Sequence, residues 1–331
     1  MTTVQRGHIP GQNHTSRKKQ RKYTYLPTEQ KRRWQMLACA IVLGCVLIFS
    51  AWQLIAYAVD YFAAQNASKE LRELYYEETA EPTGVPTPSP TQQPTATLAP
   101  QATASPSPTP PTQLEALRYP GNPYATISSR FQKLRRQNSD IIGWLSIPDM
   151  LEEAVVQRDN AYYLRRDYRG YHNVNGALFL DESIDLHTRP YTLLVYGHNM
   201  KTGAMFGNLR NYEKLNYYRK NPFITFDTMY EDGRYVIFSV AELSLNARDH
   251  NFMNFTKISS DSIAWRKEAI SELVNNSVFY VGIDVQPQDQ LLLLITCVDD
   301  DDERRILAAR RIRDNETEAE LIAAIKEKFE F

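Results

Sequence analysis

Cysteine is scarce in this chain, with three residues among 331. Two of them, Cys39 and Cys45, lie inside a long apolar segment near the N-terminus, which leaves Cys297 as the only thiol beyond that segment. The scarcity excludes a disulfide within the part of the chain that contains Cys297. An unpaired thiol of this kind is either a buried apolar residue or a nucleophile, and the two interpretations imply different functions.

Charged residues are missing from residues 36–59. A helix of that length spans about 36 Å at about 1.5 Å per residue, which is enough to cross a bilayer. Residues 1–33 hold nine lysines and arginines and one glutamate, a net charge of +8, so the remaining chain carries −9. The positive-inside rule therefore predicts a basic cytoplasmic tail over residues 1–35, a single membrane anchor over residues 36–59 and an extracellular remainder.

Two alternatives to this topology stay open. The sequence Ala56-Tyr57-Ala58 resembles a signal-peptidase site, so the segment is alternatively a cleaved signal peptide, although it is longer than the usual signal core of about 7–15 apolar residues. The basic tail is also compatible with binding to anionic lipid or to nucleic acid. Because topology alone accounts for the tail, no nucleic-acid partner is predicted.

Aromatic residues are absent from residues 78–113, where ten prolines and nine threonines fill more than half of the 36 positions. Such a segment cannot bury a core and is expected to be extended. It predicts a linker between a juxtamembrane segment, residues 60–77, and a folded domain, residues 114–331. The linker is either a plain tether or a spacer that lifts the domain through a cell wall, and the two roles are compatible.

The folded domain is predicted to be mainly β. Eight short runs of strand-forming residues, separated by turn residues, predict a closed or nearly closed eight-stranded β-barrel. These runs are residues 143–147, 176–180, 191–196, 223–226, 235–241, 278–285, 290–296 and 305–312. No internal repeat is present.

Three helices are predicted around the strands, over residues 127–138, 260–275 and 317–329. Ser128 and Ser129 are candidate caps for the first helix. Thr317 followed by Glu320 forms the pattern of a capping box for the last one.

Beyond the apolar segment the chain has four histidines, and one of them stands out by its position. His198 follows the apolar run of residues 191–196 and a glycine, so it is expected at the rim of the barrel, where side chains converge. Cys297 likewise ends a predicted strand. The other histidines lie in polar, loop-like surroundings and are predicted to be surface residues: His172, His187 and His250.

A cysteine nucleophile needs a base or cation that favours the thiolate and a donor for the developing oxyanion. His198 is the candidate base. An acidic loop, residues 299–303, leads from Cys297 into Arg304 and Arg305, and a hairpin return of this length brings an arginine back beside the cysteine. Spacing alone leaves the catalytic and structural interpretations about equally open.

Two blocks of sequence resemble the class B sortases. Residues 193–209, LLVYGHNMKTGAMFGNL, closely resemble the histidine block of that family. Thr296-Cys297, with Arg305 eight residues after the cysteine, resembles the cysteine and arginine blocks. Shorter segments that also resemble the family are residues 142–148, 176–181 and 226–230. The resemblance extends over about residues 125–313, which is most of the predicted domain.

The resemblance implies a sortase-type eight-stranded barrel with N-terminal helices, an inserted helix before the cysteine strand and a C-terminal helix. It also implies a cysteine transpeptidase that needs no cofactor and no metal. Cys297 would cleave a C-terminal sorting signal of secreted proteins through a thioester, and an amine of a cell-wall precursor or pilin would accept the acyl group. His198 would act as general acid and base, and Arg305 would stabilise the oxyanion. Asn199 and Thr296 are expected to contact the substrate.

The chain departs from the family pattern at several positions. Ile295 replaces a serine found in many class B members, and the acidic loop is either solvated or binds a cation. Strand alternation allows only one of Arg304 and Arg305 to lie on the side of Cys297. The block alignment favours Arg305. The alternatives to a transpeptidase are an exported cysteine hydrolase and an inert, sortase-shaped binding module, although retention of all three catalytic residues argues against the latter.

Overall fold

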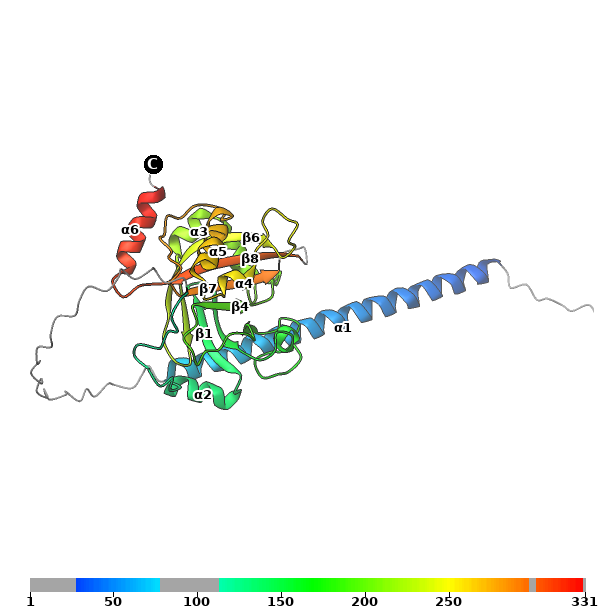
Figure 1. Ribbon diagram of the computed structural model, residues 1–331. Coiled ribbons are helices and arrows are strands. Elements are labelled where there is room, and N and C mark those ends of the chain that lie inside the picture. Colours follow the sequence, from blue (N-terminus) through cyan, green and yellow to red (C-terminus); the bar gives the residue numbers. More distant parts are fainter. Residues whose placement is uncertain (1–27, 78–112, 298–301, 330–331) are drawn as a thin grey trace, which may run out of the picture. The chain divides into compact units, whose positions relative to one another are not determined.

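The computed structural model of the chain describes residues 28–77, 113–297 and 302–329 (Figure 1). The chain divides into two compact units, residues 1–57 and residues 58–331. Helix α1 (Thr28–Tyr76) begins in the first unit and ends in the second. Its portion Thr28–Val59 is long and apolar enough to cross a membrane, as an anchor or as a signal sequence. The orientation of that portion stays a prediction.

The second unit is built on a closed β-barrel of eight strands (Figure 1). Around the barrel the strand order is β1-β2-β3-β4-β7-β8-β6-β5. The strands are β1 (Ile141–Ile147), β2 (Leu151–Val156), β3 (Leu178–Leu180), β4 (Thr192–Tyr196), β5 (Phe223–Thr228), β6 (Arg234–Ser244), β7 (Leu291–Cys297) and β8 (Glu303–Arg311). The mainly β class and the eight-stranded barrel expected from the sequence are therefore confirmed.

Two strand assignments differ from the sequence-based expectation. The pattern does not predict β2, because Glu152 and Glu153 interrupt its apolar residues. Conversely, residues 278–285 alternate as a strand would, yet they form no strand. Val281 and Ile283 are buried, so the alternation correctly marks which side chains face the core. The barrel closes without this segment, and a closed barrel has no free strand edge for it to join.

Helical segments connect and flank the strands. They are α2 (Ser129–Gln137), η2 (Tyr162–Arg165), η3 (Gly207–Glu213), α3 (Leu215–Lys220), α4 (Phe255–Ile258), α5 (Ile263–Asn275) and α6 (Glu318–Phe329). The three predicted helices correspond to α2, α5 and α6. Ser128 caps α2 by accepting from the Phe131 N–H. At α6 the Thr317 N–H donates to the Glu320 carboxylate at 2.8 Å, and the Glu320 N–H donates to Thr317 Oγ1 at 3.3 Å, which confirms the capping box.

Strands β4 and β7 are parallel neighbours in the barrel. Residues 291–294 of β7 are all buried, because both faces of the sheet are covered at this point. Burial on both faces explains why the sequence is a continuous apolar run and not an alternating one. Parallel neighbours end at the same edge of a sheet, so the residues that end β7 and follow β4 are brought close together.

The last part of α1 packs against the barrel. Leu71 and Tyr75 are buried, and the Tyr75 ring stacks on Trp144 of β1 with 4.5 Å between the ring centroids. The Tyr75 hydroxyl also donates a hydrogen bond to Asp227 of β5. The C-terminal end of α1 is therefore an integral part of the second unit.

The described chain resumes after the linker at Gln113, which forms a β-bridge with Ser262. The Leu114 N–H donates to the carbonyl of Asp261 at 2.8 Å. Both flanks of the linker therefore contact the same unit. Residues 78–112 lie outside the described part of the structure, so the expected division between linker and domain at residue 114 stays a prediction.

Candidate active site

The ends of β4 and β7 determine where the candidate catalytic residues lie along the barrel. Tyr196, the last residue of β4, pairs with Ile295 of β7, and the Gly197 N–H donates to the Ile295 carbonyl at 3.1 Å. His198 and Cys297 each follow this rung by two residues. The fold therefore brings together, at one edge of the barrel, two residues that are far apart in the sequence.

Cys297 is the last residue of β7 and is paired with Arg304 of β8. Its side chain lies outside the described part of the structure, as do residues 298–301, which include most of the acidic loop. The cation-binding alternative for that loop concerns residues in this same gap. The position of Cys297 is therefore given by the residues with which its backbone pairs in the sheet.

One nitrogen of the His198 ring forms a hydrogen bond with the backbone. Nε2 lies 2.6 Å from the backbone carbonyl oxygen of Leu164 in η2. A carbonyl oxygen only accepts, so Nε2 carries the proton of this hydrogen bond. In the neutral ring Nδ1 is then unprotonated and is the nitrogen available for proton transfer.

Gly176 allows this contact to form. Its φ angle is +62°, in the left-handed region that favours glycine. A Cβ atom at this position would lie 2.8 Å from the Leu164 carbonyl oxygen and 3.1 Å from Cδ2 of His198. A side chain would therefore push the ring and the carbonyl apart. No sequence pattern signals the role of Leu164, because the contact depends on how η2 folds against the residues after β4.

The ladder between β7 and β8 separates the two candidate arginines. Cys297 pairs with Arg304, and Thr296 pairs with Arg305. Residues directly opposite each other in an antiparallel pair share a face of the sheet, so position 304 shares the face of position 297. The block alignment favours Arg305 for the catalytic role. The register favours Arg304, so the choice between the two arginines stays a prediction.

Arg305 lies on the other face, where its guanidinium is 2.7 Å from the Glu213 carboxylate and 2.5 Å from the Glu242 carboxylate. Only 8% of Arg305 is exposed. Thr296, an expected substrate contact, lies on this same face and is also buried. Arg305 and Thr296 are therefore both buried on the face opposite to that of position 297.

Arg304 interacts with Tyr196 at the end of β4. Burial raises the pKa of Tyr196 above its usual value, Asp181 raises that pKa further, and the Arg304 guanidinium acts in the opposite direction.

The other predicted residues lie close to the rim or at the surface. Asn199 is half-buried and forms a β-bridge with Met205 in the turn that follows His198. Ile295 is buried, so the apolar replacement in the family pattern belongs to the core. The three histidines predicted to be surface residues are exposed: His172, His187 and His250.

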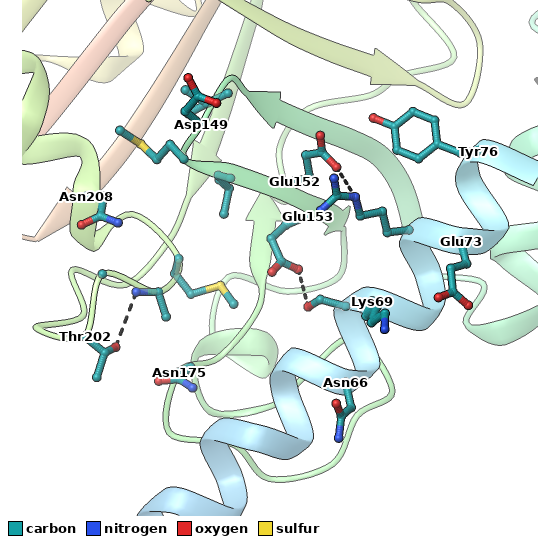
Figure 2. A pocket seen from close by; sticks show the side chains of 18 residues that line it. Asn66, Lys69, Glu73, Tyr76, Asp149, Glu152, Glu153, Asn175, Thr202 and Asn208 are labelled. Carbon is teal, nitrogen blue, oxygen red and sulfur yellow. Dashed lines mark hydrogen bonds and ion pairs between the residues drawn. The ribbon is translucent and has the colours of Figure 1, made fainter. Parts of the chain in front are cut away.

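A cleft of about 1000 Å³ borders the loop after His198 (Figure 2). The end of α1, the turn between β1 and β2, and residues 202–205 line it. Two contacts join α1 to β2 in this cleft: Ser68 Oγ donates to Glu153 at 2.7 Å, and Arg72 pairs with Glu152 at 2.5 Å. Burial raises the pKa of Glu153 to about 7. Protonation of Glu153 is therefore linked to the packing of α1.

Comparison with known proteins gives the family. No family model matches the chain. Sortase B of Staphylococcus aureus (strain NCTC 8325 / PS 47) is 26% identical over 168 residues, which make up 50% of this chain and 66% of that protein. Sortase B of Listeria monocytogenes serovar 1/2a is 31% identical over 123 residues, 35% of this chain and 48% of that protein. The chain is a class B sortase homologue.

Solved sortase structures share the fold. Sortase B from Bacillus anthracis in complex with AAEK1 superimposes with a TM-score of 0.56 at 20% identity, over 77% of this chain and 99% of that one. The Staphylococcus aureus sortase B–substrate complex gives a TM-score of 0.51 at 25% identity, over 57% of this chain and 87% of that one. The sequence matches span 66% and 48% of the two curated sortases.

Proposed function

We propose that this class B sortase homologue is a cysteine transpeptidase. The observation that carries the proposal is the arrangement of β4, β7 and β8, which brings His198, Cys297 and Arg304 to one end of three neighbouring strands. A thiol, an imidazole and a guanidinium are the groups that acyl transfer through a thioester requires.

In the first half of the reaction, the Cys297 thiolate attacks a backbone carbonyl in the C-terminal sorting signal of a secreted protein. Arg304 stabilises the oxyanion, because a guanidinium stays charged and offers several donors in one plane. Collapse of the intermediate breaks the C–N bond and leaves a thioester on Cys297. His198, which carries on Nδ1 the proton lost by the Cys297 thiol, gives that proton to the departing amine.

In the second half, an amine of a cell-wall precursor or pilin attacks the thioester. His198 takes a proton from this amine, a new amide forms and the Cys297 thiolate leaves. Nδ1 performs both proton transfers, since Nε2 donates to the Leu164 carbonyl.

Two solved structures support the assignment of reactants. Staphylococcus aureus sortase B has been solved in a substrate complex, and a sortase B has been solved in a complex with triglycine. By analogy, this chain takes a peptide sorting signal and an amine acceptor. We place the N-terminus in the cytoplasm, residues 36–59 in the membrane and the barrel outside the cell.

The test uses the full chain in detergent micelles with a pool of sorting-signal peptides, with and without triglycine. We expect an acyl-enzyme in the intact mass spectrum, an amide product with triglycine, and neither in Cys297→Ala, whose circular dichroism should be unchanged. Products that do not change when triglycine is added would identify a hydrolase. If no peptide forms a thioester, the inert binding module becomes the better interpretation.

A further inference from the structure

The cleft beside the loop after His198 holds polar side chains that the proposed transpeptidation does not use. Its volume of about 1000 Å³ lies at the upper end of the range that small-molecule sites occupy. Figure 2 shows Asn175 and Asn208 on one wall, and Asn66 and Tyr76 of α1 on the other. These side chains therefore converge on one cavity from segments that are far apart in the sequence.

One buried polar atom in the cleft indicates a ligand. Asn175 is only 2% exposed, and within the described residues its Oδ1 has no hydrogen-bond partner. The backbone N–H of Asn175 donates to Asn173 Oδ1 at 2.8 Å, so the segment that carries this side chain is held in place. A buried carboxamide oxygen without a partner is unfavourable, and a donor on a bound molecule would satisfy it.

The turn that follows His198 presents a second carboxamide. Asn208 packs over Gly203, whose φ angle is +86°, and a Cβ atom at Gly203 would lie 2.7 Å from Oδ1 and from Nδ2 of Asn208. In the same turn Met205 has a φ angle of +50°, which is rare for a residue with a side chain. Such conformations persist where the surrounding structure enforces them, often at ligand sites. This wall of the cleft is therefore preformed.

The charges in the cleft favour a neutral ligand. Four carboxyl side chains and two cationic side chains line it, which disfavours an anion. One of the cations, Arg72, is already paired with Glu152 at 2.5 Å. Glu73 and Asp149 lie at opposite ends of the cleft in Figure 2, so these two carboxylates do not converge on a single cation.

We propose that this cleft binds a neutral ligand rich in hydroxyl groups, of the sugar class. A hydroxyl group donates and accepts hydrogen bonds, as a carboxamide does, so Asn66, Asn175 and Asn208 match the hydroxyl groups of a sugar ring. Tyr76 is 44% exposed and offers an aromatic face to the apolar C–H side of such a ring. The inference goes beyond the proposed transpeptidation, because binding requires no turnover.

Saturation-transfer NMR on the full chain in phosphatidylcholine nanodiscs tests the inference. The probes are cellotriose and triacetylchitotriose, which are neutral trisaccharides that differ in the group at carbon 2. We expect saturation transfer to at least one of them, with an affinity that falls about tenfold in Asn175→Ala and in Tyr76→Leu, since each substitution removes a contact. Tyr124→Leu changes a tyrosine that is 90% exposed, and as the matched control it should keep the wild-type affinity.

Absence of transfer to both trisaccharides would overturn the inference. Binding that Asn175→Ala and Tyr76→Leu both leave unchanged would also overturn it, because the sugar would then lie elsewhere. Transfer to triglycine that Tyr76→Leu abolishes, without transfer to either trisaccharide, would assign the cleft to a peptide instead. If Asn175→Ala fails to fold, the exposed Tyr76 position decides the outcome.

The same titration of Cys297→Ala separates this inference from the proposed function. We expect the trisaccharide to bind this variant as tightly as the wild type, whether or not the wild type forms a thioester. Loss of thioester formation alone would contradict the proposed transpeptidation and leave the sugar site intact. Loss of sugar binding alone would contradict the sugar site and leave the transpeptidation intact.

Discussion

Arg304 and Arg305 are adjacent in the sequence but lie in opposite surroundings. Arg304 pairs with the nucleophile position and interacts with Tyr196, whereas Arg305 lies between Glu213 and Glu242. Successive residues of a strand point to opposite faces, so one step along β8 leads from the proposed catalytic position to a buried ion pair.

Replacing each arginine by methionine tests this division. We expect Arg304→Met to lower kcat/KM for the sorting peptide by about 10²–10³, because an oxyanion donor is lost. Arg305→Met should leave kcat/KM within about threefold and lower the free energy of unfolding by about 1 kcal/mol, since both carboxylates are partly exposed. Steady-state kinetics and urea unfolding measure the two effects. The reverse pattern would return the catalytic role to Arg305.

Gly176 offers a second test at the residue scale. Gly176→Ala should lower the rate of acyl transfer by about 100-fold, because the added methyl group displaces the His198 ring from the Leu164 carbonyl. Nitrogen NMR of His198 should show the loss of the tautomer that is protonated at Nε2. Gly121→Ala is the control, since nothing lies within 4 Å of its Cβ position. An unchanged tautomer in Gly176→Ala would disprove the positioning role.

Candidate site residues could be singled out from the sequence where the signal is local. His198 lies in a long contiguous block, and Cys297 ends an apolar run, so both could be singled out. The choice of Arg304 depends on the register between β7 and β8, and the Leu164 contact depends on packing between distant segments. Neither is encoded in the spacing of residues along the chain.

The element that sequence analysis missed, β2, owes its unusual composition to its partner. Glu152 and Glu153 are polar because they bind Arg72 and Ser68 of α1, and not because they face solvent. A periodicity rule treats any carboxylate as a surface residue, so it fails where one element supplies polar contacts to another. Residues 60–77 were expected to form a separate segment; Ser68 and Arg72 in that range contact the barrel.

The contact between α1 and β2 should depend on pH. The pKa of Glu153 is raised from 4.5 to about 7 in the folded protein, so the folded state binds more protons than the unfolded state between these values. The stability contributed by protonated Glu153 is complete below about pH 4.5 and is lost as the pH rises through about 7. We expect amides of residues 69–76 to exchange faster at about pH 8 than at about pH 5, after correction for intrinsic exchange.

Glu153→Gln should remove most of this pH dependence, because an amide keeps the hydrogen bond with Ser68 without titrating. Glu182→Gln changes an exposed carboxylate and serves as the matched control. Hydrogen exchange monitored by mass spectrometry is the measurement for both variants. A pH dependence that survives in Glu153→Gln would assign it to another group.

For the whole molecule, seven of the eight strands were predictable but their order was not. Most strands are marked by their own apolar residues, whereas the parallel pairing of β4 with β7 joins segments separated by β5 and β6 in the sequence. The catalytic arrangement follows from that pairing. Strand patterns alone do not specify this pairing, whereas the resemblance to class B sortases implies the barrel that contains it.

Both flanks of the proline-rich linker contact the second unit. This predicts that the two parts of the chain stay together when the linker is cut. A protease site introduced within residues 78–112 of the full chain allows the linker to be cut. We expect the two fragments to copurify in mild detergent, because Leu71 and Tyr75 stay buried against the barrel. Tyr75→Ala should weaken the association after cutting. Spontaneous separation of the wild-type fragments would show that the α1 contact is too weak to hold them.

A cut in the linker would therefore break the chain without separating the barrel from α1. The severed barrel would stay bound to the end of α1 through the buried side chains of Leu71 and Tyr75. Because residues 78–112 are then not the sole connection between α1 and the barrel, changes in the length of that stretch should be tolerated without separating the two.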